Sequence, residues 1–506
     1  MEVQAVTFTR GRERHAMGES QLTLFQPNFN RSIRVEARPQ RLTADAGTLL
    51  LRELMDRTGL SRSIHEHLVD LRDADRITHP LLELVRTRIL LDAQGYPDQV
   101  DANVLRDDPA LRLSVSERRG LSPLRSPGRA REPEGLASQP TLSRTLDALT
   151  VTENLEGLDR VLHQSAARLS PHSAEPKPEV TFDLDSLPIE VHGHQPGSAY
   201  NGHFRACCYH PLLLRNHEGF YLAGRLREGN AHTADGSLDF VLPILREERR
   251  RSEQVWLRMD AGFPEPALLG TLEEERIRYV ARLRSNTVLE QLAQPYLRRP
   301  PGRPPAEGRT WLHELRYRAK SWSRARRVVL VVLERPGEQG ELFLDHFFLL
   351  TNASQRLASA EHVLRRYRER GTAEKDFGDW KNALSIRLSS APRPKRHYRG
   401  QPVRAEITEP DSFSANEARL LLSLLAANLL HAATLLLNRS LHTAWSRERF
   451  RQLVLKAAGR VLVSGRRIIV AIDAARARLW RAFWRELVKT HPARGSPTLQ
   501  ALPTPA

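Results

Sequence analysis

The sequence predicts an α/β protein in which a core of alternating strands and helices lies between helical regions. Two observations support this fold class. Apolar residues recur at helical spacing in 42–110, and they alternate with polar residues at strand spacing in several runs of 180–283. Helical spacing then returns after residue 358. At 506 residues, the chain is long enough to bury more than one hydrophobic core.

The N-terminal part is predicted to be an arm followed by a helical region. Residues 1–40 lack periodicity and carry scattered charge, which predicts a flexible arm in which 28–38 could add a strand. In residues 41–170, clusters of apolar side chains predict several short helices. The stretch 116–135, rich in Arg, Pro, Gly and Ser, is predicted as a loop that either contacts a nucleic-acid backbone or is only solvated.

One further helix of this region is predicted to begin in the segment 139–144. Pro140 and Thr141 are residues that favour the first turn of a helix. If this helix reads DNA, Arg144 is a candidate for contacting it, and a plain packing helix is the alternative.

Residues 179–283 are predicted to form the first part of the core, after a Pro-containing linker at 171–178. The order of elements is three strands, a helix, a strand, a helix and a final strand, which is characteristic of the ribonuclease H-like fold. The sequence therefore predicts a ribonuclease H-like core. The strands are predicted at 180–187, 209–214, 220–226, 255–259 and 278–283, and the helices at 240–250 and 267–276.

A strand-rich insertion is predicted at 284–350, because three runs of residues with β-type composition follow a Pro-rich loop at 299–305. Helical spacing from 358 through 381 predicts that 351–390 is a helical region containing Glu374. The remaining segments are predicted as a basic loop and C-terminal helices at 391–490, with helices at 416–437 and 447–463, and a disordered tail at 491–506.

The charge balance predicts a polyanionic partner. The chain has 77 Lys and Arg residues against 60 acidic residues, a formal net charge of +17, and a pI near 10.5. Such an excess favours binding to nucleic acid. The alternative is an Arg-rich composition without functional meaning.

Cysteine usage and hydropathy predict a cytoplasmic protein that does not enter a membrane. The only cysteines are the neighbours Cys207 and Cys208, which predicts reduced, structural thiols. No signal peptide is evident. The most apolar run, 420–437, is interrupted by Asn428 and His431, so we predict a buried core helix there.

A helical stripe of charged and aromatic side chains is the strongest candidate for a functional site. On one α-helix, Tyr367, Arg370, Glu374 and Lys381 fall at roughly 0°, 300°, 340° and 320°, so they share one face. A carboxylate flanked by Arg and Lys suits a reaction at a phosphodiester, where the cations position phosphate oxygens and the carboxylate holds a divalent ion. A solvated charged face is the alternative.

Two further acids lie where open α/β sheets place ligands. Asp185 is at or near the end of the first predicted strand, and Asp260 follows the strand 255–259. The carboxyl ends of parallel strands are the ligand-binding edge of such sheets. Each acid alone could equally be a cap or turn residue.

Together, Asp185, Asp260 and Glu374 form a set of hard oxygen ligands suited to Mg²⁺ or Mn²⁺. Two such ions about 3.5–4 Å apart can activate a water or a 3′-hydroxyl and stabilise the leaving oxygen in phosphoryl transfer. The three residues are far apart in the sequence, so only a fold can bring them together.

The chain resembles DDE transposases of bacterial insertion sequences, in the IS4-like superfamily and, within it, the IS1380 family. The signature Tyr-x₂-Arg-x₃-Glu-x₆-Lys of that superfamily is matched at Tyr367, Arg370, Glu374 and Lys381 with every spacing preserved. The resemblance covers about residues 40 to 480. Other matching segments are Asp183-Leu184-Asp185, Gly193-x-Gln195-x-Gly197, Tyr200-Asn201, Tyr209-His210-Pro211-Leu212, Leu226-Arg227-x-Gly229-Asn230, Arg258-x-Asp260-x-Gly262-Phe263, Thr351-Asn352 and Asn416-x-x-Arg419-Leu420.

The resemblance implies a catalytic triad of Asp185, Asp260 and Glu374 that binds Mg²⁺ and performs cut-and-paste transposition. It implies that the N-terminal helical region binds the terminal inverted repeats of the element, and that a strand-rich insertion precedes the glutamate. The expected partners are double-stranded DNA of the inverted repeats and of the target, and a second copy of the chain, since two ends must be held at once. The expected location is the bacterial nucleoid.

The sequence departs from the family pattern at Leu187, Pro196 and Ala261, where the family has Thr, Glu and Ser. None of these departures removes a predicted metal ligand, but the lost hydroxyl groups and carboxylate could lower activity. Asp183 competes with Asp185 as the first acid, and the position in the motif favours Asp185.

Two alternatives for function remain open at this point. One is a catalytically decayed transposase that binds DNA sequence-specifically without cutting it. The other is a ribonuclease H-fold nuclease that lacks strand transfer.

Among aromatic and imidazole side chains, we expect Trp311, Trp322 and Trp380 to pack in the core or else to stack on an unpaired base. We expect His192 and His194 to be structural or to contact DNA.

Overall fold

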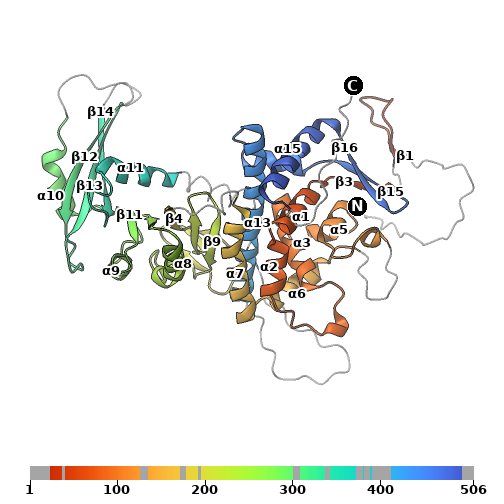
Figure 1. Cartoon of the computed structure of the whole chain (residues 1–506), viewed down its shortest axis with the longest axis horizontal. Helices are drawn as coiled ribbons and strands as arrows, with labels where there is room; N and C mark the ends of the chain where they lie inside the picture. The colour runs from red at the N-terminus through yellow and green to blue at the C-terminus, as the bar shows by residue number, and fades with distance from the viewer. Residues whose placement is uncertain are drawn as a thin grey trace, which may run out of the picture.

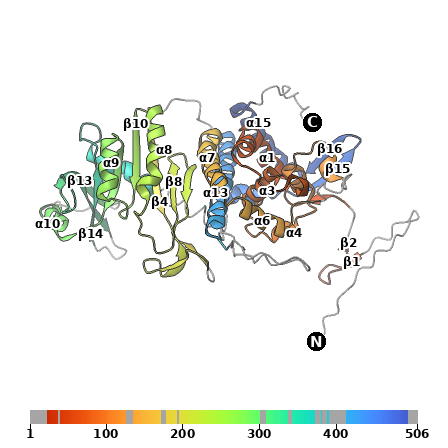
Figure 2. The same ribbon diagram turned by 90° about the horizontal axis from the view of Figure 1, so that it is seen from below.

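The computed structural model describes residues 23–36, 40–125, 135–170, 178–191, 195–299, 308–336, 342–371, 380, 388–389 and 412–492. The described chain is elongated and has two halves (Figure 1). A half built around a large sheet meets a mainly helical half along two helices, α7 (Thr152–Leu169) and α13 (Ser412–Leu441). The view from below in Figure 2 shows the same division.

The helical half confirms the helices predicted from residue 42 to 170. Local capping explains several of their ends. The carboxylate of Asp108 accepts a hydrogen bond from the backbone N–H of Leu111 at the start of α5, where Pro109 occupies the first turn. The helices before α7 are α1 (Thr48–Arg57), α2 (Leu60–His67), α3 (Leu81–Gln94), α4 (Asp101–Val104), α5 (Pro109–Val115) and α6 (Gln139–Ala148), with 3₁₀ turns at Ala74–Arg76 and Ser122–Leu124.

The other half contains a mixed sheet of eight strands in the order β12-β13-β14-β11-β10-β4-β8-β9. β4 is parallel to β10 and β10 to β11, while β8 and β9 are antiparallel to their neighbours. All the strands predicted in 180–283 are present. The strands of this part are β4 (Glu179–Ser186), β8 (Leu212–Asn216), β9 (Tyr221–Arg225), β10 (Gln254–Met259) and β11 (Arg278–Leu283).

The strands predicted in 284–350 extend the same sheet. β12 (Arg309–Tyr317), β13 (Arg326–Pro336) and β14 (Leu342–Thr351) form an antiparallel meander, and β14 pairs with β11. The short helix α10 (Thr287–Ala293) and a 3₁₀ turn at Gln294–Tyr296 precede them. The predicted insertion is thus a continuation of the core sheet at its β11 side (Figure 1).

Helices cover both faces of the sheet. Along β4, Val180, Phe182 and Leu184 belong to the main hydrophobic core, and the alternate residues Thr181 and Asp183 lie on the opposite face. That opposite face carries α11 (Ala360–Arg368). The main core also contains residues of α8 (Ser237–Arg251) and α9 (Pro266–Glu274), which connect β9 to β10 and β10 to β11.

α13 is the central helix of the molecule and confirms the core helix predicted from 420 to 437. It is long and apolar enough to cross a membrane by length and composition, but 89% of its most apolar window is buried inside the protein. It packs against α1, α3, α7 and α15 (Ala474–Thr490) of the helical half and against β9 of the sheet. Its buried leucines join both halves in one hydrophobic core.

The C-terminal region differs from the prediction. The segment 447–463 is not helical throughout, because α14 (Arg447–Phe450) passes through a π-helical turn at Arg451–Leu455 into a strand, β15 (Gly459–Ser464). β15 pairs along its whole length with β16 (Arg467–Ile472) and also with β3 (Leu42–Thr43). Val461 and Val463 before the turn at Ser464 and Gly465, and the β-branched run Ile468-Ile469-Val470 after it, are the strand and turn signals that the helical prediction overlooked.

Two small sheets were not expected from the sequence. One joins β5 (Ile189–Glu190), β7 (Ala206–Tyr209) and β6 (Ala199–Asn201) beside the end of β4. The other joins β1 (Thr23–Phe25) and β2 (Val35–Glu36) within the predicted arm. The rest of the arm, residues 1–22, and the tail after 492 lie outside the described residues.

Candidate active site

Asp185 and Asp260 lie at the same edge of the sheet, as their positions in the sequence predict. Asp185 is the penultimate residue of β4, and Asp260 directly follows β10. Because β4 and β10 are parallel neighbours, with Leu184 opposite Met259, their carboxyl ends are side by side. The two side chains are 17% and 50% exposed, respectively, so both reach solvent.

The guanidinium group of Arg370 lies between these two carboxylates. Its Nη2 donates to Oδ2 of Asp185 at 2.8 Å, and its Nη1 is 4.0 Å from Oδ1 of Asp260. The other oxygen of Asp185, Oδ1, accepts a hydrogen bond from the backbone N–H of Ser186 at 2.8 Å. The Arg370 side chain is only 4% exposed. The structure thus brings together three of the residues predicted for the site.

Asp183, the competing first acid, is held by buried arginines. Its Oδ1 accepts from Nε of Arg258 at 2.6 Å, its Oδ2 accepts from Nη2 of the same residue at 2.8 Å, and Nε of Arg215 is 3.6 Å away. Asp183 has no exposed surface. Since bidentate pairing with arginine occupies both of its oxygens, Asp183 is placed to stabilise the sheet. Of the two candidates for the first acid of the site, Asp185 is the one that reaches solvent.

Arg258 also defines the end of α11. Its Nη1 donates to the backbone carbonyl of Arg366 at 3.0 Å and lies 3.2 Å from Oε2 of Glu369. In a continuing helix, the carbonyl of residue 366 would accept from the N–H of residue 370. α11 ends at Arg368, so the prediction of one unbroken helix from 358 through 381 is wrong at Glu369, where the chain makes a turn.

This turn separates two residues that the predicted stripe had placed together. Tyr367 lies on α11 with its ring centroid 6.3 Å from that of Phe347, beside the cluster of apolar residues beneath the helix. Arg370 points instead to Asp185. The other two members of the predicted stripe, Glu374 and Lys381, lie outside the described residues.

α11 is fixed on the sheet by polar contacts as well as by packing. Arg366 donates to Oγ1 of Thr181 at 2.8 Å and to Oε1 of Glu179 at 2.5 Å, both on β4. The guanidinium carbon of Arg366 also lies 4.1 Å from the ring centroid of Trp256 on β10. These contacts fix the last turn of α11 over the first half of β4 and β10, and the chain continues from there to Arg370 at the carboxyl end of β4.

The carboxylates at the strand ends match part of a divalent-ion site. Asp185 and Asp260 offer carboxylate oxygens, the ligand type that Mg²⁺ and Mn²⁺ prefer, at adjoining strand ends. Within the described ranges, no group of three or more His, Cys, Asp or Glu side chains could hold a metal ion. The residues therefore fit two ligands of a hard-ion site, and Arg370 supplies the cationic charge between them in this structure.

Several motif residues around the site have structural roles. Arg227 donates to the backbone carbonyl of His210 at 2.8 Å, and burial lowers the pKa of Arg227 to about 10. Burial also lowers the pKa of His210, whose Nδ1 lies 3.0 Å from the carbonyl oxygen of Ala231. Gly229 has to be glycine, because a Cβ there would lie 2.0 Å from the carbonyl oxygen of Cys208.

The remaining candidates are distributed as follows. Arg144 is exposed on α6 in the helical half, with Nη2 3.4 Å from Oγ1 of Thr141. Trp380 and Trp322 are core residues, 1% and 5% exposed. Trp311 on β12 is half-buried and lines a pocket of about 780 Å³ beside α11. His192 and His194 lie outside the described residues.

The sequence-based search missed Arg258 and Glu369. Arg258 lies within the apolar strand 255–259, and it faces Asp183 in the first strand. A charged residue inside a buried strand needs an oppositely charged partner. Asp183 and Arg258 are charged residues of opposite sign inside neighbouring predicted strands, and each lies two positions before a predicted site acid. This pattern could have identified them as an ion pair.

Comparison with known protein families gives one match, which covers nearly the whole chain. A family model described as "Transposase DDE domain group 1" matches residues 25–490. No curated protein matches the chain. The matched range includes the helical half, the sheet, α11 and the C-terminal hairpin of β15 and β16.

Proposed function

Because this chain belongs to the family of DDE transposases, we propose that it binds the terminal inverted repeats of an insertion sequence and catalyses cut-and-paste transposition. The observation that carries the proposal is the pair Asp185 and Asp260, placed by parallel strands at one edge of the sheet and joined through Arg370. We further propose membership of the IS4-like superfamily and the IS1380 family, from the Tyr367, Arg370, Glu374 and Lys381 signature.

We propose a ribonuclease H-like core. Five strands of the sheet, in the spatial order β9-β8-β4-β10-β11, support it. The first three strands in sequence are antiparallel neighbours, and the last two add in parallel on the other side of β4 after crossover helices α8 and α9. This arrangement places the carboxyl ends of β4 and β10 together, where the site requires them.

We propose Glu374 as the third acid of the site. It lies four positions after Arg370, whose guanidinium group contacts Asp185. Because an extended chain advances at most about 3.5 Å per residue, the Cα atom of Glu374 is within about 14 Å of that of Arg370. Chain length therefore allows the carboxylate of Glu374 to approach both aspartates.

In the proposed mechanism, Asp185, Asp260 and Glu374 would hold Mg²⁺ or Mn²⁺. The bound ions would supply activation of the attacking oxygen and stabilisation of the leaving oxygen in phosphoryl transfer. Arg370 orients the carboxylate of Asp185, with the N–H of Ser186 on the other oxygen. Arg370 and Lys381 would contact phosphate, and Tyr367 would orient the DNA strand or Glu374. The protein would first cut the element's ends and then join the freed 3′-hydroxyls to target DNA.

DNA recognition is assigned to the helical region 41–170. We propose that this region, including Arg144 on α6, binds the inverted repeats, and that two copies of the chain hold the two ends together in the bacterial nucleoid. The formal charge of +17 supports a DNA partner. A chain that binds ends without cutting them, and a nuclease that cuts without joining, are the two alternatives.

A cleavage and joining assay tests this function. The full chain is incubated with duplex DNA that carries the element's own ends, with either Mg²⁺ or EDTA, and nicked, excised and joined products are separated on gels. We expect metal-dependent cleavage at the ends, followed by joining to a target plasmid. The Glu374→Ala variant should bind the same DNA and produce neither product.

The other outcomes of this assay identify the alternatives. Cleavage without joined product, even with a supplied pre-cut end, would indicate a nuclease. Sequence-specific binding without cleavage by the wild-type chain would indicate a decayed transposase. Equal cleavage by the wild-type chain and Glu374→Ala would remove Glu374 from the site.

Replacing Arg370 should weaken catalysis without unfolding the site. Arg370→Ala removes a charge-assisted hydrogen bond to Asp185, which is typically worth about 1.5–3 kcal/mol. If that energy is used to position Asp185, single-turnover cleavage should slow by about 10- to 100-fold. Arg370→Lys should not restore the rate, because a lysine cannot reach two carboxylates with a planar pair of N–H groups.

The rate is measured with pre-bound DNA ends at saturating Mg²⁺, and DNA affinity is measured in parallel. If Arg370 acts only by binding DNA phosphate, the variant will lose affinity and will recover its rate at higher protein concentration. A change confined to affinity would therefore contradict the positioning role.

A further inference from the structure

We propose that the C-terminal hairpin and α15 form a second DNA-binding surface, which holds the phosphate backbone of duplex DNA away from the cleavage site. The proposal rests on the proposed function, because it extends DNA contact from the N-terminal helical region to a separate part of the chain. We call this the C-terminal basic surface. It consists of seven exposed cations: Arg460, Arg466, Arg467, Arg478, Arg481, Arg485 and Lys489.

The charge of this surface is almost entirely uncompensated. From residue 459 to 490 the chain contains eight cations and only two acids, Asp473 and Glu486. Asp473 accepts from Arg476 at 2.8 Å, and Glu486 is 8% exposed and lies 3.3 Å from Nε of Arg439. Both acids are thus paired, so they do not neutralise the exposed cations beside them.

The exposed arginines of the surface have no acidic partners among the residues that the structure describes. In the part of the chain that the structure describes, the ion pair that involves the surface is weak, since Nζ of Lys489 is 4.0 Å from Glu486 and its side chain is 74% exposed. Unpaired, solvated cations on a folded surface are the usual footprint of a polyanion-binding site. The six surface arginines without an acidic partner are Arg460, Arg466, Arg467, Arg478, Arg481 and Arg485.

α15 presents its cations in a line. Its buried face, with Ala482, Phe483 and Leu487, belongs to the main core and packs on α13. At about 100° per residue, the four cations at 478, 481, 485 and 489 fall within roughly 80° of one another on the outer face. At about 1.5 Å per residue they extend over about 16 Å. One DNA strand carries a phosphate about every 3.4 Å along the axis, so this line spans about five phosphates.

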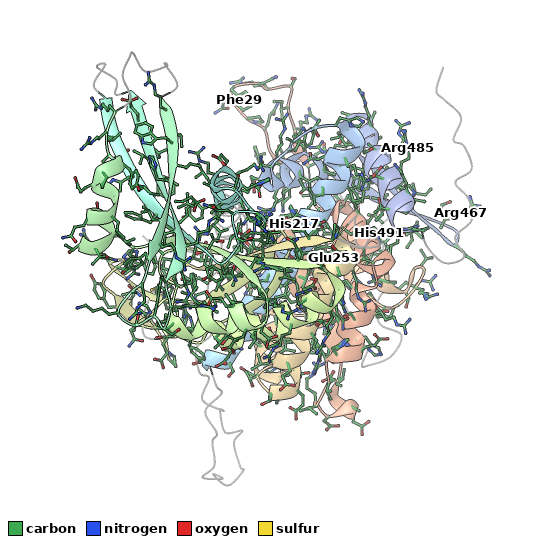
Figure 3. All side chains as sticks on the ribbon, turned by 60° about the vertical axis from the view of Figure 1, so that its left-hand side comes forward. Phe29, His217, Glu253, Arg467, Arg485 and His491 are labelled. Atoms are coloured by element: carbon green, nitrogen blue, oxygen red, sulfur yellow. The ribbon has the colours of Figure 1, made fainter. Side chains whose placement is uncertain are left out.

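The hairpin adds cations at the same end of the molecule. Gly465 has a φ of +59° in the turn between β15 and β16, and Arg466 and Arg467 follow it at the tip. Figure 3 shows Arg467 at the tip of the hairpin and Arg485 on α15, both at the same end of the molecule. α13 separates this end from the sheet and from α11 (Figure 1).

Charge favours DNA as the occupant of this surface. The hairpin also exposes Leu462, Val463 and Ile469, by 36%, 40% and 47%, which would suit a second copy of the chain. However, two copies meeting through this surface would bring their unpaired arginines together, and like charges repel at close range. The phosphate backbone removes that repulsion and releases counterions on binding.

The test measures the salt dependence of DNA affinity. Full-length protein is titrated into a fluorescent 40-base-pair duplex of random sequence, and separately into an end-containing duplex, at 50 to 300 mM KCl. The test variant is Arg478→Gln/Arg481→Gln/Arg485→Gln. The matched control is Arg246→Gln/Arg250→Gln/Arg251→Gln, which removes the same charge from the exposed side of α8.

We expect the test variant to reduce the slope of log affinity against log salt by about 2 to 3, since each lost phosphate contact changes it by about 0.9. Affinity for the random duplex near 0.1 M salt should fall by about 100-fold. The control should change the slope by less than about 0.5. A hairpin variant, Arg466→Gln/Arg467→Gln, should give a smaller reduction in the same direction.

Equal slopes for the test variant and the control would overturn the proposal, provided that circular dichroism shows both to be folded. A change in oligomeric state by light scattering, with an unchanged slope, would assign the surface to a second copy and also overturn it. Failure of the proposed function is distinguishable, because it appears as absence of end cleavage by the wild-type chain, whatever the slope of the variant. A reduced slope in a chain that does not cleave would support the surface alone.

Discussion

Asp260→Asn is expected to reduce DNA end cleavage by about 10³-fold or more, because a carboxylate that holds a catalytic divalent ion contributes several kcal/mol to transition-state stabilisation. The side chain lies at the end of β10, half exposed, where an amide of the same shape fits without disturbing the strand. Binding of end DNA should be retained. Single-turnover cleavage at saturating protein and Mg²⁺ measures the loss, and gel shift measures binding.

Asp185→Asn should give a loss of the same size for the same reason. The amide would keep one hydrogen-bonding oxygen for Arg370 or for the N–H of Ser186, so the local fold should persist. Replacement of Mg²⁺ by Mn²⁺, which tolerates a poorer ligand set, should recover part of the activity of both variants if the acids are metal ligands.

The matched control is Glu253→Gln. Glu253 is an exposed acid that directly precedes β10, at the opposite end of the strand from Asp260. Its replacement removes one negative charge from the same strand without touching the predicted site, so cleavage should be unchanged. Wild-type cleavage rates for Asp260→Asn would show that the aspartate pair is not the reaction centre.

Arg258→Ala should be the most destabilising single change considered for the sheet half. Among the described residues, it leaves the fully buried Asp183 with Arg215, at 3.6 Å, as its cationic partner. Removing one member of a buried ion pair typically costs about 3–5 kcal/mol. The change also removes the donor to the carbonyl of Arg366, so the end of α11 loses a fixed position. Both the free energy of unfolding and the cleavage rate should fall.

Denaturant unfolding followed by tryptophan fluorescence measures the stability change. Arg246→Ala is the control, because Arg246 forms a surface ion pair with Glu275 at 2.5 Å and is 50% exposed. An exposed pair of this kind is worth about 0–1 kcal/mol. If Arg258→Ala and Arg246→Ala lower the free energy of unfolding by the same small amount, the buried ion pair of Asp183 and Arg258 does not stabilise the sheet half.

The sequence was sufficient to predict most of the sheet half. Alternation along 180–187 and the apolar run 255–259 predicted two strands whose ends carry Asp185 and Asp260, and the fold places these ends together. The local pattern of apolar residues was enough to predict these strands, because each strand is buried on one face or on both. Burial on one face places an apolar residue at every second position of a strand.

The contact of Arg258 with the end of α11 and the contact of Arg370 with Asp185 could not be predicted from local pattern. The helical stripe assumed that 358–381 is one helix, whereas a side chain from β10, 108 residues away, donates to the carbonyl of Arg366. The helical prediction over 447–463 is wrong for a different reason. The β-branched residues and the Ser464-Gly465 turn of the β15–β16 hairpin are visible in the sequence, whereas the pairing of β15 with the distant β3 is not. A tertiary partner decides the break at Glu369, and no local period contains that information.

The central position of α13 bears on how a copy of this gene could lose its activity. A chain that stopped before residue 412 would lack the helix whose leucines fill the space between β9 and the N-terminal helices, and those apolar surfaces would be left in water. Stop codons before residue 412 would therefore yield aggregated or degraded fragments. A DNA-binding repressor derived from this protein is expected to keep α13 and to lose cleavage by point mutation at an acid such as Asp260.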